Sequence, residues 1–249
     1  MNLKTVDALS DKLDYEMSWR RIELTNIKFN VENVEGTVLN TNLRSSLVLL
    51  YAHWEGFVKK ALTYYLEHVS KQKLPNNQLK HNFYALEIHS DMQLFNETNK
   101  NKLHTKIIDS ILGNMAKESS IPYKNKIDTK SNLKSELFKE LMFTVGLDSS
   151  QYETYFRLID ERLLGTRNQI AHGEELKQLQ LTKDSYLELH KKMTELMDAL
   201  KEQIINAAMN KLYMVTPLEN ATVEEISSDI QAMNDSIDIV EDKKVLVPV

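Results

Sequence analysis

The chain of 249 residues contains no cysteine, only six glycines and only four prolines. Without cysteine it cannot form disulfides, hold zinc through thiolates or use a cysteine nucleophile. Glycine and proline interrupt helices, and they are scarce here beside abundant leucine, lysine, glutamate, methionine and isoleucine. The sequence therefore predicts an all-α fold, and its length is sufficient to bury a large core.

Long apolar runs and an excess of basic charge are also missing. No stretch approaches the roughly 20 apolar residues that cross a bilayer, and the first residues lack the apolar core of a signal peptide. We therefore expect a cytoplasmic protein with no membrane partner. The formal net charge of -5 argues against a general nucleic-acid coat, but it leaves room for a local basic cleft.

The charge is segregated along the chain. Lysines outnumber acids between residues 100 and 139, whereas acids dominate beyond residue 218. Both segments are also consistent with ordinary solvated surfaces. We predict a single helical domain over residues 1–213 and an acidic C-terminal tail or peripheral appendage over residues 214–249. One hypothesis is that this tail covers a basic cleft electrostatically.

Apolar residues recur at helical spacing along most of the chain. The pattern predicts helices over about residues 3–27, 40–71, 101–115, 133–145, 152–164 and 182–208, with another around Tyr84, and a loop over 119–130. In the first helix Leu9, Leu13, Met17 and Ile22 are expected to share the buried face. The helix over 40–71 has the strongest apolar stripe and is the predicted core helix: Leu43, Leu47, Leu50, Trp54, Phe57, Leu62 and Leu66. Thr182 is a predicted N-cap and Gly146 a predicted helix end.

The most informative segment is Arg-Asn-Gln-Ile-Ala-His-Gly at residues 167–173. Arginine is permanently charged and grips phosphate with a planar fork, whereas histidine titrates near neutrality and can move a proton. Five helical positions separate Arg167 from His172 by about 140° and about 7.5 Å, so the two could reach one phosphate from different sides. Asn168 lies four residues before His172 and could orient its ring. A short helical turn starting near Thr166 would itself favour an anion.

Other catalytic patterns are absent from the sequence. The seven histidines show no His-Glu-x-x-His or comparable metal-ligand spacing. There is no glycine-rich phosphate loop and no Gly-x-Ser-x-Gly nucleophile elbow. We therefore expect neither a metal nor another cofactor. The Arg-x4-His spacing alone is weak evidence, because short motifs also arise by chance.

Three ordered segments carry a resemblance to a known family. The motif at Arg167, Asn168, Ala171, His172 and Gly173 resembles the Arg-x(4 to 6)-His motif of the HEPN superfamily. Residues 50–59, Leu-Tyr-Ala-His-Trp-Glu-Gly-Phe-Val-Lys, resemble an early helix of the RiboL-PSP-HEPN branch, also called the MAE-type HEPN group. Residues 127–133 and the following helix to Asp148 resemble a third element of that branch. The similarity covers about residues 43–200.

The resemblance implies a HEPN-type helical bundle with additional helices that pairs as a homodimer, so that two motifs form one composite site. It also implies a metal-independent endoribonuclease that attacks through the RNA 2'-hydroxyl, typical of toxins and antiphage-defence effectors. His172 would be the general acid and base, Arg167 would neutralise charge on phosphorus, and Asn168 would be the orienting polar residue. Single-stranded RNA or tRNA loops are the expected substrates.

Partner proteins are expected in such a system, with one departure. In toxins silenced by a nucleotidyltransferase that modifies tyrosine, a tyrosine lies two positions past the motif histidine, but Glu174 occupies that place here. This disfavours that antitoxin, while another antitoxin or defence-system partner remains an expectation.

Alternatives stay open at several positions. For Glu55 and Tyr51 we weigh an auxiliary role, reaching the motif, against an ordinary helical pair with Lys59. Arg167 and His172 could also form a structural helix end. Trp54, Phe57 and Tyr64 are expected in the core rather than as base-stacking platforms, and His53 and His190 are assigned to structure. The alternative functions are a non-catalytic HEPN module that binds RNA, a nucleotide or a protein, and a purely structural helical partner.

Overall fold

The computed structural model describes residues 3–97, 99–175 and 181–215. Within these ranges the regular structure is helical, with no strand beyond two isolated bridges, one joining Pro75 to Glu118 and one joining Leu79 to Met214. The all-α prediction is confirmed. The chain up to Met214 forms one compact unit. The predicted acidic tail lies outside the described residues from position 216 onward. No described helix combines the length and apolar character needed to cross a membrane.

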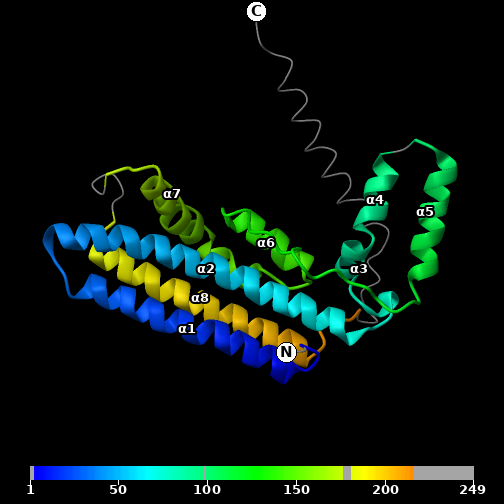
Figure 1. Ribbon diagram of the computed structural model, residues 1–249, viewed down its shortest axis with the longest axis horizontal. Coiled ribbons are helices and arrows are strands. Elements are labelled where there is room, and N and C mark those ends of the chain that lie inside the picture. The colour runs from blue at the N-terminus through cyan, green and yellow to red at the C-terminus, as the bar shows by residue number, and fades with distance from the viewer. Residues whose placement is uncertain (1–2, 98, 176–180, 216–249) are drawn as a thin grey trace, which may run out of the picture. The chain divides into compact units, whose positions relative to one another are not determined.

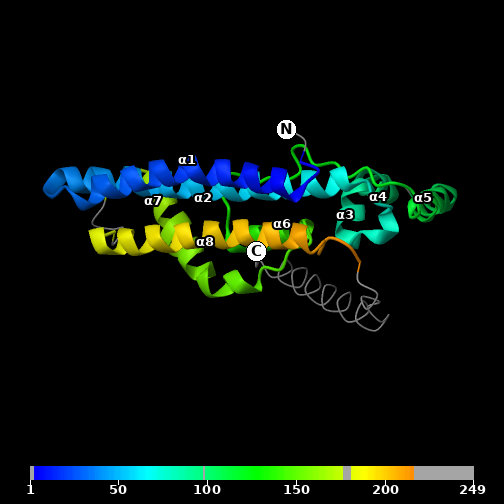
Figure 2. The same cartoon turned by 90° about the horizontal axis from the view of Figure 1, so that it is seen from below.

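Three long helices form the framework: α1 (Val6–Glu32), α2 (Gly36–Gln72) and α8 (Lys183–Met209). Each contacts the other two, and they run side by side in Figure 1, while Figure 2 shows α8 below the α1 and α2 pair. All seven residues of the predicted α2 stripe are buried. Trp54 and Phe57 are therefore core residues, as predicted, and Tyr64 is partly buried against the same core.

The predicted buried face of α1 was wrong at one position. Leu9, Leu13 and Met17 are buried, but Ile22 is 66% exposed. Five residues separate Met17 from Ile22, a rotation of about 140° that carries the isoleucine away from the core. The buried face continues instead through Arg20 and Leu24.

Local signals fixed the helix ends. The Thr5 hydroxyl accepts the Ala8 N–H at the start of α1, and Thr182 caps α8 in a reciprocal capping box with Ser185. Gly146 has φ +70° just past α6 (Ser135–Thr144). Its N–H donates to the Phe143 carbonyl at 2.8 Å, which closes the helix in a left-handed turn. The caps predicted at Thr182 and Gly146 are both confirmed.

A smaller helical group follows α2. After a 3₁₀ turn, η1 (Asn76–Gln78), come α3 (His81–Glu87), α4 (His89–Asn96) and α5 (Asn101–Asn114), at one end of the long helices in Figure 1. We predicted α3 and α5 but not α4. None of the residues of α4 is buried, so its sequence has no core-facing stripe to reveal it. The loop predicted over 119–130 lies between α5 and α6 and contains no helix.

The segment predicted as a helix over residues 152–164 is helical and leads into the motif as expected, but it is not a regular α-helix. Residues Ser150–Tyr155 form a 3₁₀ helix, η2, and Leu158–Gly165 form a π-helical segment, η3. That segment runs directly into α7 (Thr166–Ala171). The Thr166 N–H is already bonded to the Leu163 carbonyl, so no free helix N-terminus exists there. The anion site that we predicted at that N-terminus is therefore also wrong.

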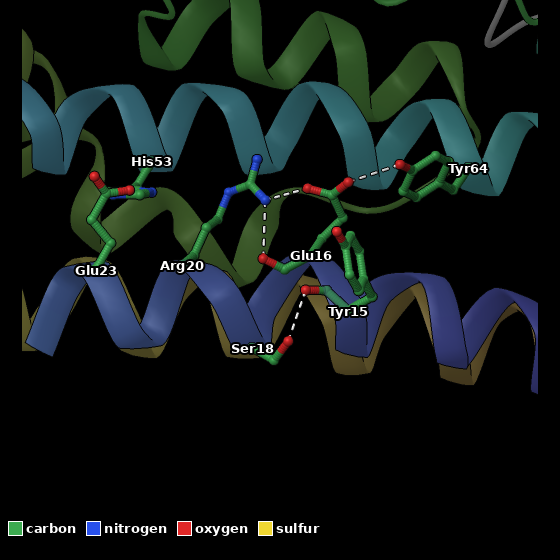
Figure 3. A network of polar contacts seen from close by, with 7 residues as sticks. All are labelled: Tyr15, Glu16, Ser18, Arg20, Glu23, His53 and Tyr64. Carbon is green, nitrogen blue, oxygen red and sulfur yellow. Dashed lines mark hydrogen bonds and ion pairs between the residues drawn. The ribbon is translucent and has the colours of Figure 1, made fainter.

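A buried ion pair within α1 is also hydrogen-bonded to α2. The Arg20 guanidinium donates to the Glu16 carboxylate and, at 3.0 Å, to the Glu16 carbonyl, and the Tyr64 hydroxyl donates to the same carboxylate at 2.9 Å (Figure 3). The guanidinium also lies 4.2 Å from the centre of the Trp19 ring. Both charged residues are buried. Each charge therefore depends on the other, because a lone buried charge loses its hydration without compensation.

Two histidines occupy the same bundle. The buried His53 ring lies 3.1 Å from a Glu23 oxygen, beside the Arg20 pair in Figure 3, without the alignment of a hydrogen bond. His190 lies 3.0 Å from the Leu24 carbonyl. Burial lowers the pKa of both rings. Both histidines therefore pack as neutral groups of the framework.

We predict that Arg20→Ala lowers the free energy of unfolding by about 3–5 kcal/mol, because it leaves the Glu16 carboxylate buried without its partner. Urea unfolding followed by circular dichroism measures this loss. Arg157→Ala is the matched control, because it removes an arginine from an exposed pair with Glu161 and should change little. Equal effects of the two variants would contradict a structural role for the buried pair.

Candidate functional site

The three segments that carry the family resemblance meet in space. Tyr51 and Glu55 lie on α2, the loop over residues 127–134 passes beside them, and Arg167 lies on α7, which packs against α2. Far-separated parts of the sequence thus supply one cluster. Its members are held by direct contacts rather than by general proximity.

The Arg167 guanidinium is fixed from three sides. Its central carbon lies 4.5 Å from the centre of the Tyr51 ring. One terminal nitrogen donates to the Asn168 side-chain oxygen at 2.7 Å, and the other donates to the Ser131 carbonyl at 3.3 Å. Arginine has five N–H groups, so these two bonds leave donors for an anion. The side chain is half-buried, which allows a ligand to reach it.

Tyr51 supports the cluster and does not transfer protons near neutrality. Its hydroxyl accepts the Leu133 N–H at 2.8 Å, and its ring is buried. Burial, reinforced by the Glu55 carboxylate, raises the pKa of Tyr51 to about 12. The phenol therefore remains protonated at physiological pH. Tyr51 positions two parts of the site: Arg167 packs against its ring, and the loop is hydrogen-bonded to its hydroxyl.

Glu55 lies beside the motif and is bonded to the loop that contacts it. Its carboxylate accepts the Thr129 hydroxyl at 2.6 Å, so within the described residues it anchors the loop rather than pairing with Lys59 on its own helix. Among the described residues Glu55 forms no hydrogen bond or ion pair with Arg167 or His172, and it connects to the motif through the loop. The positions of Tyr51 and Glu55 beside the motif were foreseen, but their attachment to the loop was not.

The loop is held in an uncommon backbone conformation. Lys130 and Ser131 have φ values of +52° and +51°, in the left-handed region that costs a non-glycine residue roughly 1–2 kcal/mol. Thr129 and Leu133 are buried on either side and bonded to Glu55 and Tyr51, while the residues between them are exposed. These anchors keep the exposed stretch in place next to Arg167.

His172 stands at the open end of the motif. It is the C-cap residue of α7, its N–H donates to the Asn168 carbonyl at 3.0 Å, and its side chain is exposed. None of the side-chain hydrogen bonds or ion pairs found in the described ranges involves its ring. Asn168 therefore orients Arg167 with its side chain and His172 only through the backbone, in contrast to the predicted contact with the imidazole.

Gly173 ends the motif with φ +82°. Its N–H donates to the Ile170 carbonyl and the Glu174 N–H to the Gln169 carbonyl, the paired bonds of a Schellman motif. No atom would crowd a Cβ at this position, so only the backbone conformation calls for glycine. This turn sets where His172 leaves the helix.

The sequence analysis missed Arg44. From α2 its guanidinium donates to the Glu174 carbonyl and, at 3.4 Å, to the Ile170 carbonyl. It thereby binds one carbonyl in the last turn of α7 and one just beyond His172. Arg44 lies seven residues before Tyr51, two helical turns along the same face, and this spacing was the only signal that could have indicated it.

The motif residues thus form a cation and an imidazole on one short, supported helix. The arrangement suits binding of a phosphate oxygen by Arg167 and proton transfer by His172. No cluster of three or more potential metal ligands occurs in the part of the chain that the structure describes.

We predict that Gly173→Ala lowers the free energy of unfolding by about 1 kcal/mol, because alanine resists a positive φ. The matched control is Gly113→Ala in α5, where the glycine has open space and a helical backbone. That change should raise stability by about 0.5–1 kcal/mol. Thermal or urea unfolding distinguishes the two, and stabilisation at position 173 would contradict the described turn.

Comparison with known families agrees with the geometry. A model of the RiboL-PSP-HEPN family matches residues 15–206, a longer stretch than the motifs alone indicated. Searches of curated proteins and of solved structures found no match. The match covers most of α1, all of α2 and most of α8 as well as the Arg167 cluster, and a HEPN-type domain points to a nuclease-like or RNA-related function. The chain therefore belongs to the RiboL-PSP-HEPN family.

Proposed function

We propose that the protein is a metal-independent endoribonuclease that acts as a homodimer, as a toxin or antiphage-defence effector. The observation that carries this proposal is the pairing of a held cation with an exposed imidazole on one helix. Arg167 is fixed by Tyr51, Asn168 and Ser131, while His172 is solvent-accessible. Family membership supports the same conclusion.

In the proposed reaction, His172 removes the proton from an RNA 2'-hydroxyl. The 2'-oxygen then bonds to the adjacent phosphorus, and the bond from phosphorus to the 5'-oxygen breaks. The leaving 5'-oxygen takes a proton, so the products are a 2',3'-cyclic phosphate and a 5'-hydroxyl. Arg167 stabilises the extra negative charge on the phosphoryl oxygens as the 2'-oxygen bonds. DNA is not a substrate because it lacks the 2'-hydroxyl.

The reaction gives a physical reason for two copies. In an in-line displacement the attacking and leaving oxygens lie on opposite sides of phosphorus, so one imidazole is poorly placed to serve both. Tyr51 does not supply the second proton-transfer group, because its hydroxyl is bonded to Leu133 and its pKa is raised to about 12 by burial and by Glu55. We therefore assign the second role to His172 of a partner copy.

An exposed apolar surface on α1 offers a place for that copy. Tyr15, Trp19, Ile22 and Phe29 are exposed, and with Asn26 their positions alternate four and three residues apart, the spacing of a helix-pairing seam. The Trp19 ring centre lies 5.5 Å from that of His53 on α2. The neighbouring Leu49 and Ala52 are also exposed. Exposed apolar residues thus occur on α2 as well, where Ala52 lies between Tyr51 and His53 in the chain.

We predict that Arg167→Ala and His172→Ala each reduce RNA cleavage at least 100-fold, because each removes a group that acts in the transition state. The assay uses a labelled single-stranded RNA and identifies cyclic-phosphate ends, with the matching DNA as a substrate control. Arg157→Ala, an exposed arginine elsewhere, should cleave normally. In cells, only the active proteins should slow growth. RNA binding without cleavage by the wild type would instead identify a non-catalytic module.

A charged residue placed in the exposed apolar surface of α1 tests the proposed dimer. Ile22→Glu should convert the protein to a monomer and reduce cleavage, because a buried glutamate at an interface has no partner. Leu112→Glu on α5 is the matched control, because both side chains are 66% exposed in the single chain. Sedimentation measures the mass of each variant. A dimeric, active Ile22→Glu protein would contradict this interface.

A further inference from the structure

A groove adjoins Arg167 on the side of the strained loop. It has a volume of about 310 Å³ and is lined by Lys130, Asn132, Lys134, Glu136, Leu137 and Glu140. Lys130 and Asn132 flank Ser131, whose carbonyl accepts the Arg167 guanidinium. Two lining residues of the groove therefore flank the residue that binds the proposed catalytic cation, so an RNA strand with a phosphate on Arg167 can extend into the groove.

The two lysines of the groove precede its two glutamates along the chain. Lys130 is on the loop next to the Arg167 contact, and Lys134 is the residue before α6. Glu136 and Glu140 lie farther along, on α6 itself. Neither lysine ammonium forms an ion pair with another residue in the described ranges. The charged lining residues that precede α6 are thus both basic and those on α6 are both acidic, which favours one phosphate at the two lysines and disfavours a further one along α6.

The backbone explains how the two lysines are held. The backbone of Lys130 has a positive φ, which is rare for residues other than glycine, and its N–H donates to the Asp128 carboxylate at 2.9 Å. The Asn132 N–H donates to the Thr129 carbonyl at 3.1 Å, and the Lys134 N–H donates to the Asn132 carbonyl at 2.9 Å. With the anchors to Tyr51 and Glu55, these bonds hold an otherwise unfavourable turn. Conformations of this kind concentrate at ligand-binding sites.

We propose that this groove is a second phosphate subsite, in which Lys130 and Lys134 bind the RNA phosphate next to the one that is cleaved. The attached nucleoside lies toward Leu137, where Asn132 can hydrogen-bond to it. This inference rests on the proposed ribonuclease function and adds a substrate-binding contact to it. The lysines bind substrate equally before and during the reaction, so they affect RNA affinity and KM more than kcat.

The test measures RNA binding in a His172→Ala background, in which the strand remains intact. The test variant is Lys130→Asn with Lys134→Gln, because asparagine tolerates a positive φ better than most residues. The control is Lys102→Gln with Lys106→Gln, which removes the same charge from the exposed side of α5. Lys130→Arg with Lys134→Arg keeps the charge and should retain binding.

We expect the test variant to bind single-stranded RNA about tenfold more weakly than the control, uniformly across sequences. Its plot of log affinity against log salt should be shallower by about 0.7, because the contact with one phosphate is lost. In the cleaving protein the same changes should raise KM with kcat largely retained. Glu140→Gln should tighten binding, because it removes a repelling charge from the groove.

The outcomes separate this inference from the proposed function. If the wild type cleaves RNA and the test variant binds like the control, the subsite is wrong and the ribonuclease stands. If the wild type binds RNA through Lys130 and Lys134 but never cleaves it, the subsite stands and the ribonuclease is wrong. An absence of any RNA binding overturns both.

Discussion

The candidate site depends on the packing of the Arg167 guanidinium against the Tyr51 ring. Tyr51 belongs to the core helix α2, and its hydroxyl also holds the loop through the Leu133 N–H. One side chain thus ties the motif helix and the loop to the most buried element of the fold. Burying part of a cation and holding a left-handed turn are both unfavourable, and the contacts of Tyr51 with Arg167 and with the loop offset this loss of free energy.

The three long helices hold Tyr51, and therefore its contact with Arg167, in place. The helices α1, α2 and α8 share one core, and the Tyr64 hydroxyl of α2 donates to the Glu16 carboxylate of the buried pair within α1. Arg44 holds the other end of the motif from α2, because it binds the Ile170 carbonyl of α7 and the Glu174 carbonyl just beyond it. The proposed chemistry therefore uses a short helix of little intrinsic stability, positioned by a long helix that is held on several sides.

The sequence predicted the elements with strong periodicity or clear caps. The α2 stripe, the Thr182 cap and the Gly146 helix end all followed from local patterns. The π-helical segment before Thr166 did not, because an i to i+5 turn leaves no mark in apolar spacing that distinguishes it from an α-helix. Helix α4 escaped prediction because none of its residues is buried.

The sequence indicated which residues lie together at the candidate site, but it did not indicate most of the contacts between them. Arg167, Asn168, Tyr51 and Glu55 do lie together, but the bond from Glu55 to Thr129 and the role of Arg44 depend on long-range packing. No short-range pattern encodes a contact between residues 74 positions apart. The catalytic roles of Arg167 and His172 stay predictions that only a measured activity tests.

The most direct test of the central claim uses the absence of cysteine. In His172→Cys the new thiol is the only one in the chain, and a short thiol-specific cross-linker can join two such chains only where their motifs face each other. We predict rapid formation of a covalent dimer by His172→Cys and none by Leu112→Cys at the same concentration. A protein that is dimeric in solution but does not cross-link at position 172 would contradict the composite site.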